Sequence, residues 1–191
     1  MTQAIHEFFR SGKLLKQCNA TTLVRIPKVQ HPTQASEFRP IACCNVIYKC
    51  ISKLLSKRLK EVLPTVVNQS QGAFIPGREL LFNVLVCQEV ARGYTRKNIS
   101  PRCMLKIDLK KAYDSIHWTF IQELLSSLKF PLQFITCVMA CITTTSFSIQ
   151  LNVSLEGYFK GGRGLRQGDP LSPLLFVLSM EYLSRLCHVQ S

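Results

Sequence analysis

The sequence predicts a mixed fold of the α/β class in its α+β form. Some segments alternate apolar and polar residues, as half-buried strands do. Others repeat apolar residues every three or four positions, as amphipathic helices do. With 47% hydrophobic residues in 191, the chain has a globular composition and is long enough for one core, or for two lobes that share one.

The first half of the chain contains one predicted strand and two predicted helices. Apolar and polar residues alternate over residues 21–28, which predicts a strand. Residues 46–63 have the apolar stripe of a helix, and Pro64 is expected to end it. A second and more buried helix is expected over residues 79–93. The first helix also carries a row of lysines, namely Lys49, Lys53, Lys57 and Lys60. We expect this row to be a solvated face, with contact to a template backbone as the alternative.

The second half alternates strands with helices. Alternation over residues 103–108 predicts a strand that ends at Asp108. A helix is expected from about 115 to 128, and the clearest strand of the chain follows at 147–153. After a glycine loop, Ser172-Pro173 supplies an N-cap and a first-turn proline for a helix that runs to about residue 187.

The charge balance points to a polyanionic partner. The chain has 24 Lys and Arg against 11 Asp and Glu, a formal charge of +13. Such an excess favours nucleic acid, whose condensed counterions are released by bound cations. A basic membrane-surface protein is the weaker alternative. No run of eighteen apolar residues occurs, which argues against a membrane span.

The N-terminus and the cysteines favour an intracellular protein. The first residues lack the basic and then apolar layout of a signal peptide. The nine cysteines include no C-x2-C pair, and several lie in apolar runs. Reduced and mostly buried thiols are therefore expected, rather than disulfides or a metal site. Whether the compartment is the nucleus or the cytoplasm stays open.

Two aspartates lie around the end of the predicted strand 103–108. A carboxylate at the end of a buried strand is costly unless it is paired or bound to a cation, and nucleotidyl transfer uses such carboxylates to hold two Mg2+ ions. For Asp108, a metal ligand and a turn residue are equally supported by this segment alone. Asp114 immediately precedes the next predicted helix, so we interpret it as an N-cap and not as a ligand.

The loop before the last helix has features of a ligand site. Its glycines allow backbone to approach a ligand closely, and Gln167 offers a donor and an acceptor beside that backbone. A capped helix after a glycine loop would explain the glycines and Ser172-Pro173. It would not explain why so polar a loop leads directly into so apolar a helix.

Several motifs, in order, resemble non-LTR retrotransposon reverse transcriptases, with wording closest to the plant versions. The signature RQGDPLSPxLF is matched by Arg166-Gln167-Gly168-Asp169-Pro170-Leu171-Ser172-Pro173-Leu174-Leu175-Phe176. The element D-x-x-K-A-[FY]-D-x-x-x-W is matched by Asp108, Lys111, Ala112, Tyr113, Asp114 and Trp118. Upstream elements are matched by Ile26-Pro27-Lys28, by Phe38-Arg39-Pro40-Ile41 with Tyr48-Lys49, and by Gln71-Gly72-Ala73-Phe74. The resemblance covers nearly the whole chain.

The resemblance implies a right-hand polymerase with fingers over residues 1–100 and part of the palm over 101–191. It implies a small antiparallel palm sheet backed by helices, with the thumb absent. The implied partners are an RNA template, a DNA primer and a dNTP, with no membrane. The chain would also lack a partner segment that carries the C-terminal palm and thumb.

The resemblance also implies roles for single residues. Asp108 would be the first catalytic, metal-binding aspartate, and the backbone carbonyl of Leu109 would add a ligand for Mg2+. Tyr113 would exclude a ribose 2'-hydroxyl. Cationic groups on the fingers would neutralise the triphosphate, and the loop would shape the nucleotide pocket; these residues are Lys28, Arg39, Gln167 and Gly168. Taken singly, an exposed lysine, an arginine in an ion pair and a core tyrosine explain three of them equally well.

The chain departs from the family pattern at one point. The family's second pair of metal ligands lies in an [FY]-x-D-D hairpin, and no Asp-Asp dipeptide occurs here. One carboxylate cannot hold two Mg2+ ions, so we expect an incomplete magnesium site, no polymerase activity of the isolated chain, and an uncovered apolar face on helix 172–187. The alternatives are a non-catalytic RNA- or DNA-binding remnant, as in splicing-maturase relatives, and a relic without function.

Overall fold

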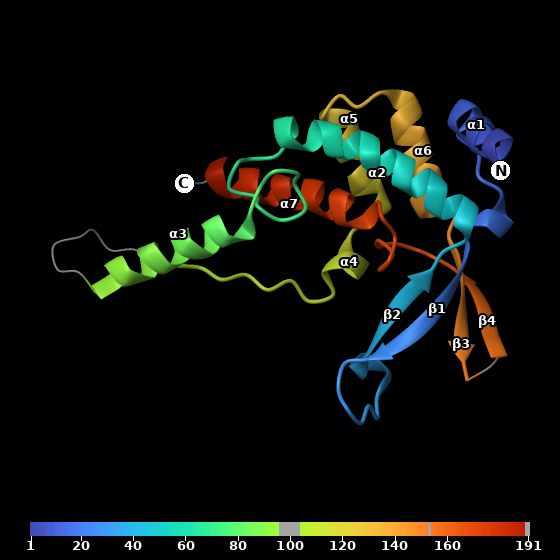
Figure 1. Ribbon diagram of the computed structural model, residues 1–191, viewed down its shortest axis with the longest axis horizontal. Coiled ribbons are helices and arrows are strands. Elements are labelled where there is room, and N and C mark those ends of the chain that lie inside the picture. Colours follow the sequence, from blue (N-terminus) through green and yellow to red (C-terminus); the bar gives the residue numbers. More distant parts are fainter. Residues whose placement is uncertain (96–103, 153, 190–191) are drawn as a thin grey trace.

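The computed structural model describes residues 1–95, 104–152 and 154–189. Figure 1 shows a four-stranded sheet at one end of an elongated molecule and helices along the rest. The predicted α+β class is confirmed. Within the described ranges, no helix combines the length and apolarity needed to cross a membrane.

The sheet has the strand order β2-β1-β3-β4. Its strands are β1 (Ala20–Pro27), β2 (Phe38–Cys43), β3 (Ser146–Leu151) and β4 (Ser154–Lys160). The outer pairs β1–β2 and β3–β4 are antiparallel, whereas β1 and β3 run parallel, with Ala20 opposite Ser146. The expectation of an antiparallel sheet is therefore wrong for the central pair. This pair joins segments about 120 residues apart in the chain, so the motif-bearing ends of both halves meet at one sheet.

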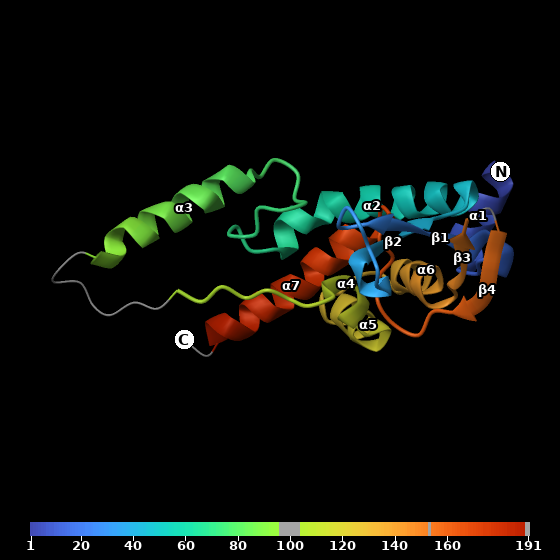
Figure 2. The same cartoon turned by 90° about the horizontal axis from the view of Figure 1, so that it is seen from below.

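The core lies between the helices that pack beside the sheet. These helices are α1 (Thr2–Ser11), α2 (Val46–Val66), α5 (Trp118–Ser127), α6 (Leu132–Thr143) and α7 (Ser172–Val189). Figure 2 shows α2 on one side of this layer and α5 to α7 on the other. The apolar stripe of α2 faces inward, with Ile51, Leu55 and Leu59 fully buried. Short 3-10 turns are formed by Lys16–Asn19, Ala35–Glu37 and Gly93–Thr95.

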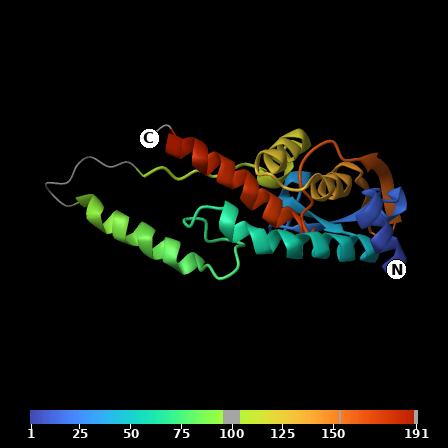
Figure 3. The same ribbon diagram turned by 90° about the horizontal axis from the view of Figure 1, so that it is seen from above.

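The two helices expected in the first half differ in detail from the structure. Pro64 does not end α2, which continues to Val66. Because Pro64 lies in the last turn, its missing N–H removes a single bond of the helix, and the N–H of Val67 still donates to the carbonyl of Leu63 at 3.0 Å. The helix α3 (Leu80–Arg92) has no buried residue, so the expected burial of residues 79–93 is wrong. Figure 3 shows α3 beyond the end of α2, away from the sheet.

The segment before the middle helices is also different from the prediction. Residues 104–110 are exposed and belong to none of the four strands, so the predicted strand over 103–108 is wrong where the structure describes it; Cys103 lies outside the described residues. A strand needs a hydrogen-bonded neighbour, and no described strand pairs with this segment. The helix expected from 115 to 128 is divided into α4 (Ala112–Ser115) and α5, with Ile116 extended between them.

Candidate nucleotide-binding site

The loop between β4 and α7 is fixed first against α4. The N–H groups of Gly164 and Leu165 donate to the carbonyls of Ile116 (2.8 Å) and Tyr113 (2.9 Å), and the indole N–H of Trp118 donates to the carbonyl of Gly164 at 2.8 Å. Gly164 has φ 87°, and a Cβ there would lie 3.0 Å from the carbonyl oxygen of Tyr113. The break between α4 and α5 leaves the Ile116 carbonyl free to accept this bond. The motif around Tyr113 and the glycine loop therefore form one unit.

Beyond Gly164 the loop is held by a buried ion pair. Nη2 of Arg166 lies 3.3 Å from Oδ2 of Asp169, and their side chains are 5% and 1% exposed. The guanidinium also donates to Oδ1 of Asn19 (2.8 Å), to Oγ1 of Thr21 (3.0 Å) and to the carbonyl of Cys141 (3.2 Å). Every donor direction of the fork is thus used at the junction of β1 and α6.

The carboxylate of Asp169 is satisfied from α2 and from its own loop. The hydroxyls of Tyr48 and Ser52 donate to its two oxygens, and the N–H of Leu171 donates to Oδ1 at 3.0 Å. The Arg166 guanidinium lies 3.9 Å from the centre of the Tyr48 ring. Burial, and next the charge of Asp169, raise the pKa of the Tyr48 phenol well above its ordinary value. The phenol therefore stays a donor to Asp169.

The Gln167–Gly168 turn lies between the members of this pair and is fixed from the sheet side. The N–H of Ala42 in β2 donates to the carbonyl of Gln167 at 2.8 Å. Gly168 has φ 100°, and a Cβ there would lie 3.1 Å from the carbonyl oxygen of Ala42. A side chain at this position would be strained in conformation and crowded against β2. The turn is therefore rigid, with the side chain of Gln167 only partly buried.

A surface pocket of about 340 Å³ opens beside this turn. Its lining consists of Tyr113, Arg166, Gln167, Gly168 and Pro173. The Tyr113 ring stacks on Phe176 of α7, with centroids 5.1 Å apart and an interplanar angle of 14°, and burial raises the pKa of its phenol. Three residues of the predicted nucleotide site, from two distant motifs, are thus brought together by the fold.

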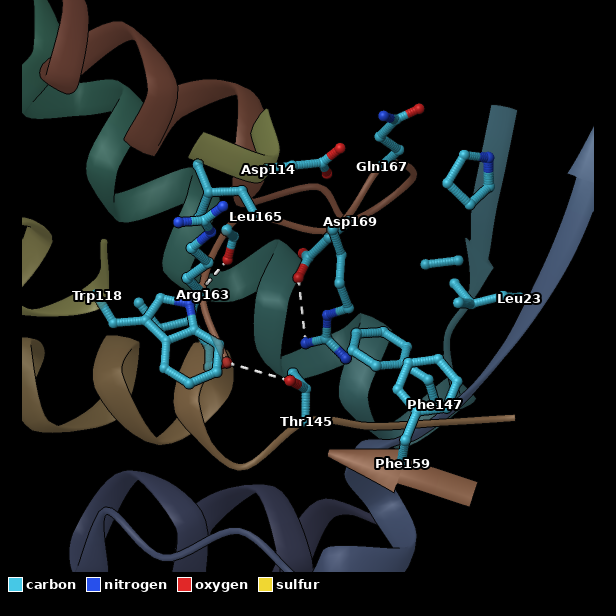
Figure 4. A pocket seen from close by; sticks show the side chains of 15 residues that line it. Leu23, Asp114, Trp118, Thr145, Phe147, Phe159, Arg163, Leu165, Gln167 and Asp169 are labelled. Carbon is cyan, nitrogen blue, oxygen red and sulfur yellow. Dashed lines mark hydrogen bonds and ion pairs between the residues drawn. The ribbon is translucent and has the colours of Figure 1, made fainter. Parts of the chain in front are cut away.

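A second, smaller cavity of about 180 Å³ lies along the same loop, and Figure 4 shows it from close by. Asp114, Gln167 and Arg163 line it together with Trp118. Asp114 is not an N-cap, which is a correction: Lys111 precedes α4, His117 precedes α5, and Asp114 lies within α4. The chain turns into the helix earlier than its periodicity suggested, because Lys111 adopts the left-handed conformation at φ 52°.

The predicted cationic residues lie on the β1–β2 hairpin. Arg39 is exposed on β2 opposite Ile26. Lys28 follows β1, and its ammonium group donates to the carbonyl of Ser36 at 2.7 Å. Their alignment on one hairpin agrees with a shared task, but neither residue lines the pocket of Tyr113.

The predicted metal-binding residues lie apart from that pocket. Asp108 is exposed in segment 104–110, and the pocket of Tyr113, Gln167 and Gly168 does not include it. Leu109 lines an apolar groove against α5 and α7 instead. Within the described residues, no group of three or more His, Cys, Asp and Glu side chains could hold a metal ion. These residues therefore do not by themselves fit a magnesium site.

Sequence reasoning missed the residues that hold the site, although it quoted most of them within motifs. Arg166 and Asp169 flank the turn and were treated only as letters of the motif. A signal was present on α2, where Ser52 and Ser56 interrupt an otherwise apolar inner face. Buried hydroxyls at such positions need partners, and Ser52 finds one in Asp169.

Comparison with known proteins gives the family. A family model described as "Reverse transcriptase (RNA-dependent DNA polymerase)" matches residues 26–191. The chain is 29% identical over 179 residues to the Transposon TX1 uncharacterized 149 kDa protein of Xenopus laevis, which covers 94% of this chain and 14% of that protein. It is 28% identical over 174 residues to the Retrovirus-related Pol polyprotein from type-2 retrotransposable element R2DM of Drosophila melanogaster, with 91% and 16% covered. An uncharacterized mitochondrial protein of Arabidopsis thaliana is 57% identical over 37 residues, 19% of this chain and 30% of that protein.

The chain spans about 14% and 16% of the lengths of the TX1 and R2DM proteins. The match nevertheless extends from β1 to the end of α7 and includes every motif that forms the pocket. The chain therefore belongs to the reverse transcriptase (RNA-dependent DNA polymerase) family, as a reverse transcriptase domain of the non-LTR retrotransposon type.

Proposed function

We propose that this chain supplies the incoming-nucleotide pocket of an RNA-directed DNA polymerase that adds dNTPs to the 3'-hydroxyl of a DNA primer on an RNA template. The observation that carries the proposal is the rigid Gln167–Gly168 turn, which is fixed by β2 on one side and by the buried Arg166–Asp169 pair on the other. A turn held in this way keeps its shape when a ligand binds, so less ordering free energy opposes binding.

Each pocket residue has a proposed task. The Tyr113 ring, packed flat on Phe176, would lie under the sugar and exclude a 2'-hydroxyl by steric contact. Gln167 and Gly168 would shape the pocket around the nucleotide and the template base. Lys28 and Arg39, on the β1–β2 hairpin, would neutralise the triphosphate as a point charge and a planar fork. Residues 1–100 and 101–191 would correspond to fingers and partial palm.

Reverse transcriptases generally use Mg2+. In this chain Asp108 and the carbonyl of Leu109 are the proposed ligands, but the described residues place no further carboxylate beside them. We therefore derive no catalytic step through the metal. We infer that the 191-residue chain binds a nucleotide without extending a primer, and that a further segment supplies the other ligands.

Equilibrium dialysis with radiolabelled dTTP and UTP tests the nucleotide pocket. Wild-type protein should bind dTTP in preference to UTP, and Gln167→Ala should weaken dTTP binding while Gln122→Ala, an exposed glutamine on α5, should not. Tyr113→Ala should reduce the preference for dTTP, whereas Tyr113→Phe should keep it. Equal binding of dTTP to all four variants and to wild type would refute the proposed pocket.

Primer extension distinguishes the polymerase from its alternative. With MgCl2, dNTPs and a primed RNA template, the 191-residue chain should synthesise no DNA; appreciable synthesis would contradict the inferred need for a further segment. The alternative is a non-catalytic remnant that binds RNA or DNA through its positive charge, and the net charge of +13 favours it. RNA binding without any dTTP binding would support this alternative.

A further inference from the structure

We propose that the lysine face of α2, formed by Lys49, Lys53, Lys57 and Lys60, is a docking surface for the sugar-phosphate backbone of a nucleic-acid strand. All four side chains are exposed. They follow one another at helical spacing, so they form a row along one side of α2. The inference extends the proposed function, because it names the surface that a template or product strand would contact.

The row is continuous and of one sign. With 3.6 residues per turn, the four lysines fill a sector of about 80° around the helix. From Lys49 to Lys60 the row is about 16 Å long at 1.5 Å per residue. One strand of a duplex carries about five phosphates over that length, at 3.4 Å each. The sole carboxylate of α2, Glu61, lies outside this sector.

The four ammonium groups are not used by the fold. In the described part of the chain, none of them makes an ion pair or a side-chain hydrogen bond. Other cations of the chain are used. Arg78 donates to four backbone carbonyls, including those of Asn68 and Gln71, and Arg185 pairs with Glu181 at 2.7 Å. Four adjacent and uncompensated charges repel one another, and a bound polyanion would relieve that repulsion.

The row lies on the side of α2 nearest the pocket loop. Around the helix it borders Ser52 and Ser56, and the Ser52 hydroxyl donates to Asp169 of that loop. Arg58, which contacts the Phe9 ring at 4.8 Å, lies on the other edge of the buried face. A strand that follows the lysines therefore runs along the flank of α2 that contacts the loop of Gln167, and not along the flank that packs on α1.

Fluorescence anisotropy with a labelled single-stranded RNA tests the surface over a range of KCl concentrations. The row variant changes Lys49, Lys53, Lys57 and Lys60 to Gln. The matched control changes Lys13, Lys16, Lys129 and Lys160, exposed lysines on other faces, to Gln and so removes the same charge. Gln has a helix propensity close to that of Lys, and circular dichroism checks that both variants fold.

The row variant should bind more weakly and should lose about 3 from the slope of log K against log salt, since each phosphate contact on a single strand contributes about 0.7. The control should lose clearly less. Equal losses in both variants would overturn the proposal, because net charge alone would explain the binding. An undiminished slope in the row variant would overturn it as well.

Two further arms identify the ligand. A labelled DNA strand of the same sequence should show the same loss as RNA, because the backbone phosphate is common to both; a loss confined to RNA would contradict backbone docking. Binding to vesicles that contain phosphatidylserine, lost in the row variant while RNA binding is kept, would assign the row to a membrane surface and overturn the proposal. These readouts measure strand binding, so their failure is distinct from failure of the dTTP test.

Discussion

Asp169→Asn should destabilise the chain strongly, because it removes the charge that compensates a buried guanidinium. The Arg166 and Asp169 side chains are 5% and 1% exposed, and their atoms lie 3.3 Å apart. Removal of one partner from such a pair leaves an uncompensated buried charge, which costs about 3–5 kcal/mol. A domain with a total stability of about 5–15 kcal/mol would lose a large part of it.

Urea unfolding followed by circular dichroism measures this loss by linear extrapolation. The matched control is Glu7→Gln, which breaks an ion pair with the same sequence spacing on the surface. Glu7 and Arg10 lie 2.7 Å apart with side chains 56% and 81% exposed, so the loss should be below about 1 kcal/mol.

Equal losses in Asp169→Asn and Glu7→Gln would refute the reasoning. If Asp169→Asn does not fold, the double variant Arg166→Met with Asp169→Leu decides the matter, since it removes both charges. It should be more stable than Asp169→Asn alone. A double variant that is less stable would show that the unpaired charge is not the cause.

Three further outcomes follow from the same loop. Gly168→Ala should lower the free energy of unfolding by about 1–3 kcal/mol, because φ is 100° and the added Cβ would crowd β2; an unchanged urea midpoint would contradict this. Trp118→Phe should lower it by about 0.5–1.5 kcal/mol for the lost bond to Gly164, and a loss near zero would show that the bond does not matter. Burial raises the pKa of Tyr48 and Cys141 above their unfolded values, so stability present below those values is lost as pH rises past the ordinary cysteine value of 9.0; a melting temperature that increases from pH 8 to 10 would disagree.

The elements with strong internal periodicity were predictable from sequence. Strand β1 and helix α2 were predicted within a few residues, and so were β3 and α7. Their patterns reflect a single buried face, which a window of sequence contains. The exposed part of α7 also agrees with expectation, since Tyr182 and Leu186 are both 45% exposed.

The failures concern properties that depend on distant neighbours. Residues 103–108 have the alternation of a strand, but strand formation also needs a partner with free hydrogen-bonding groups. Helix α3 is apolar, yet its burial would depend on a surface that packs against it. Strand β2 contains Pro40, which fits an edge strand, and β4 is exposed throughout, so neither shows a buried face.

The candidate site divides in the same way. Tyr113, Gln167 and Gly168 were named from motifs, and the fold brings them to one pocket. The residues that fix this pocket were not predictable, because the Arg166–Asp169 pair is completed by Asn19, Tyr48 and other residues more than a hundred positions away. No local pattern states which distant hydroxyl or amide will satisfy a buried charge.

Photocrosslinking with an azido-dNTP, followed by peptide mapping, tests the central claim most directly. A nucleotide bound in the proposed pocket should crosslink to peptides that contain Tyr113 or Gln167, and unlabelled dTTP should compete. Crosslinks confined to α1 and α6, on the opposite flank of α2, would contradict a nucleotide site at the Gln167–Gly168 turn.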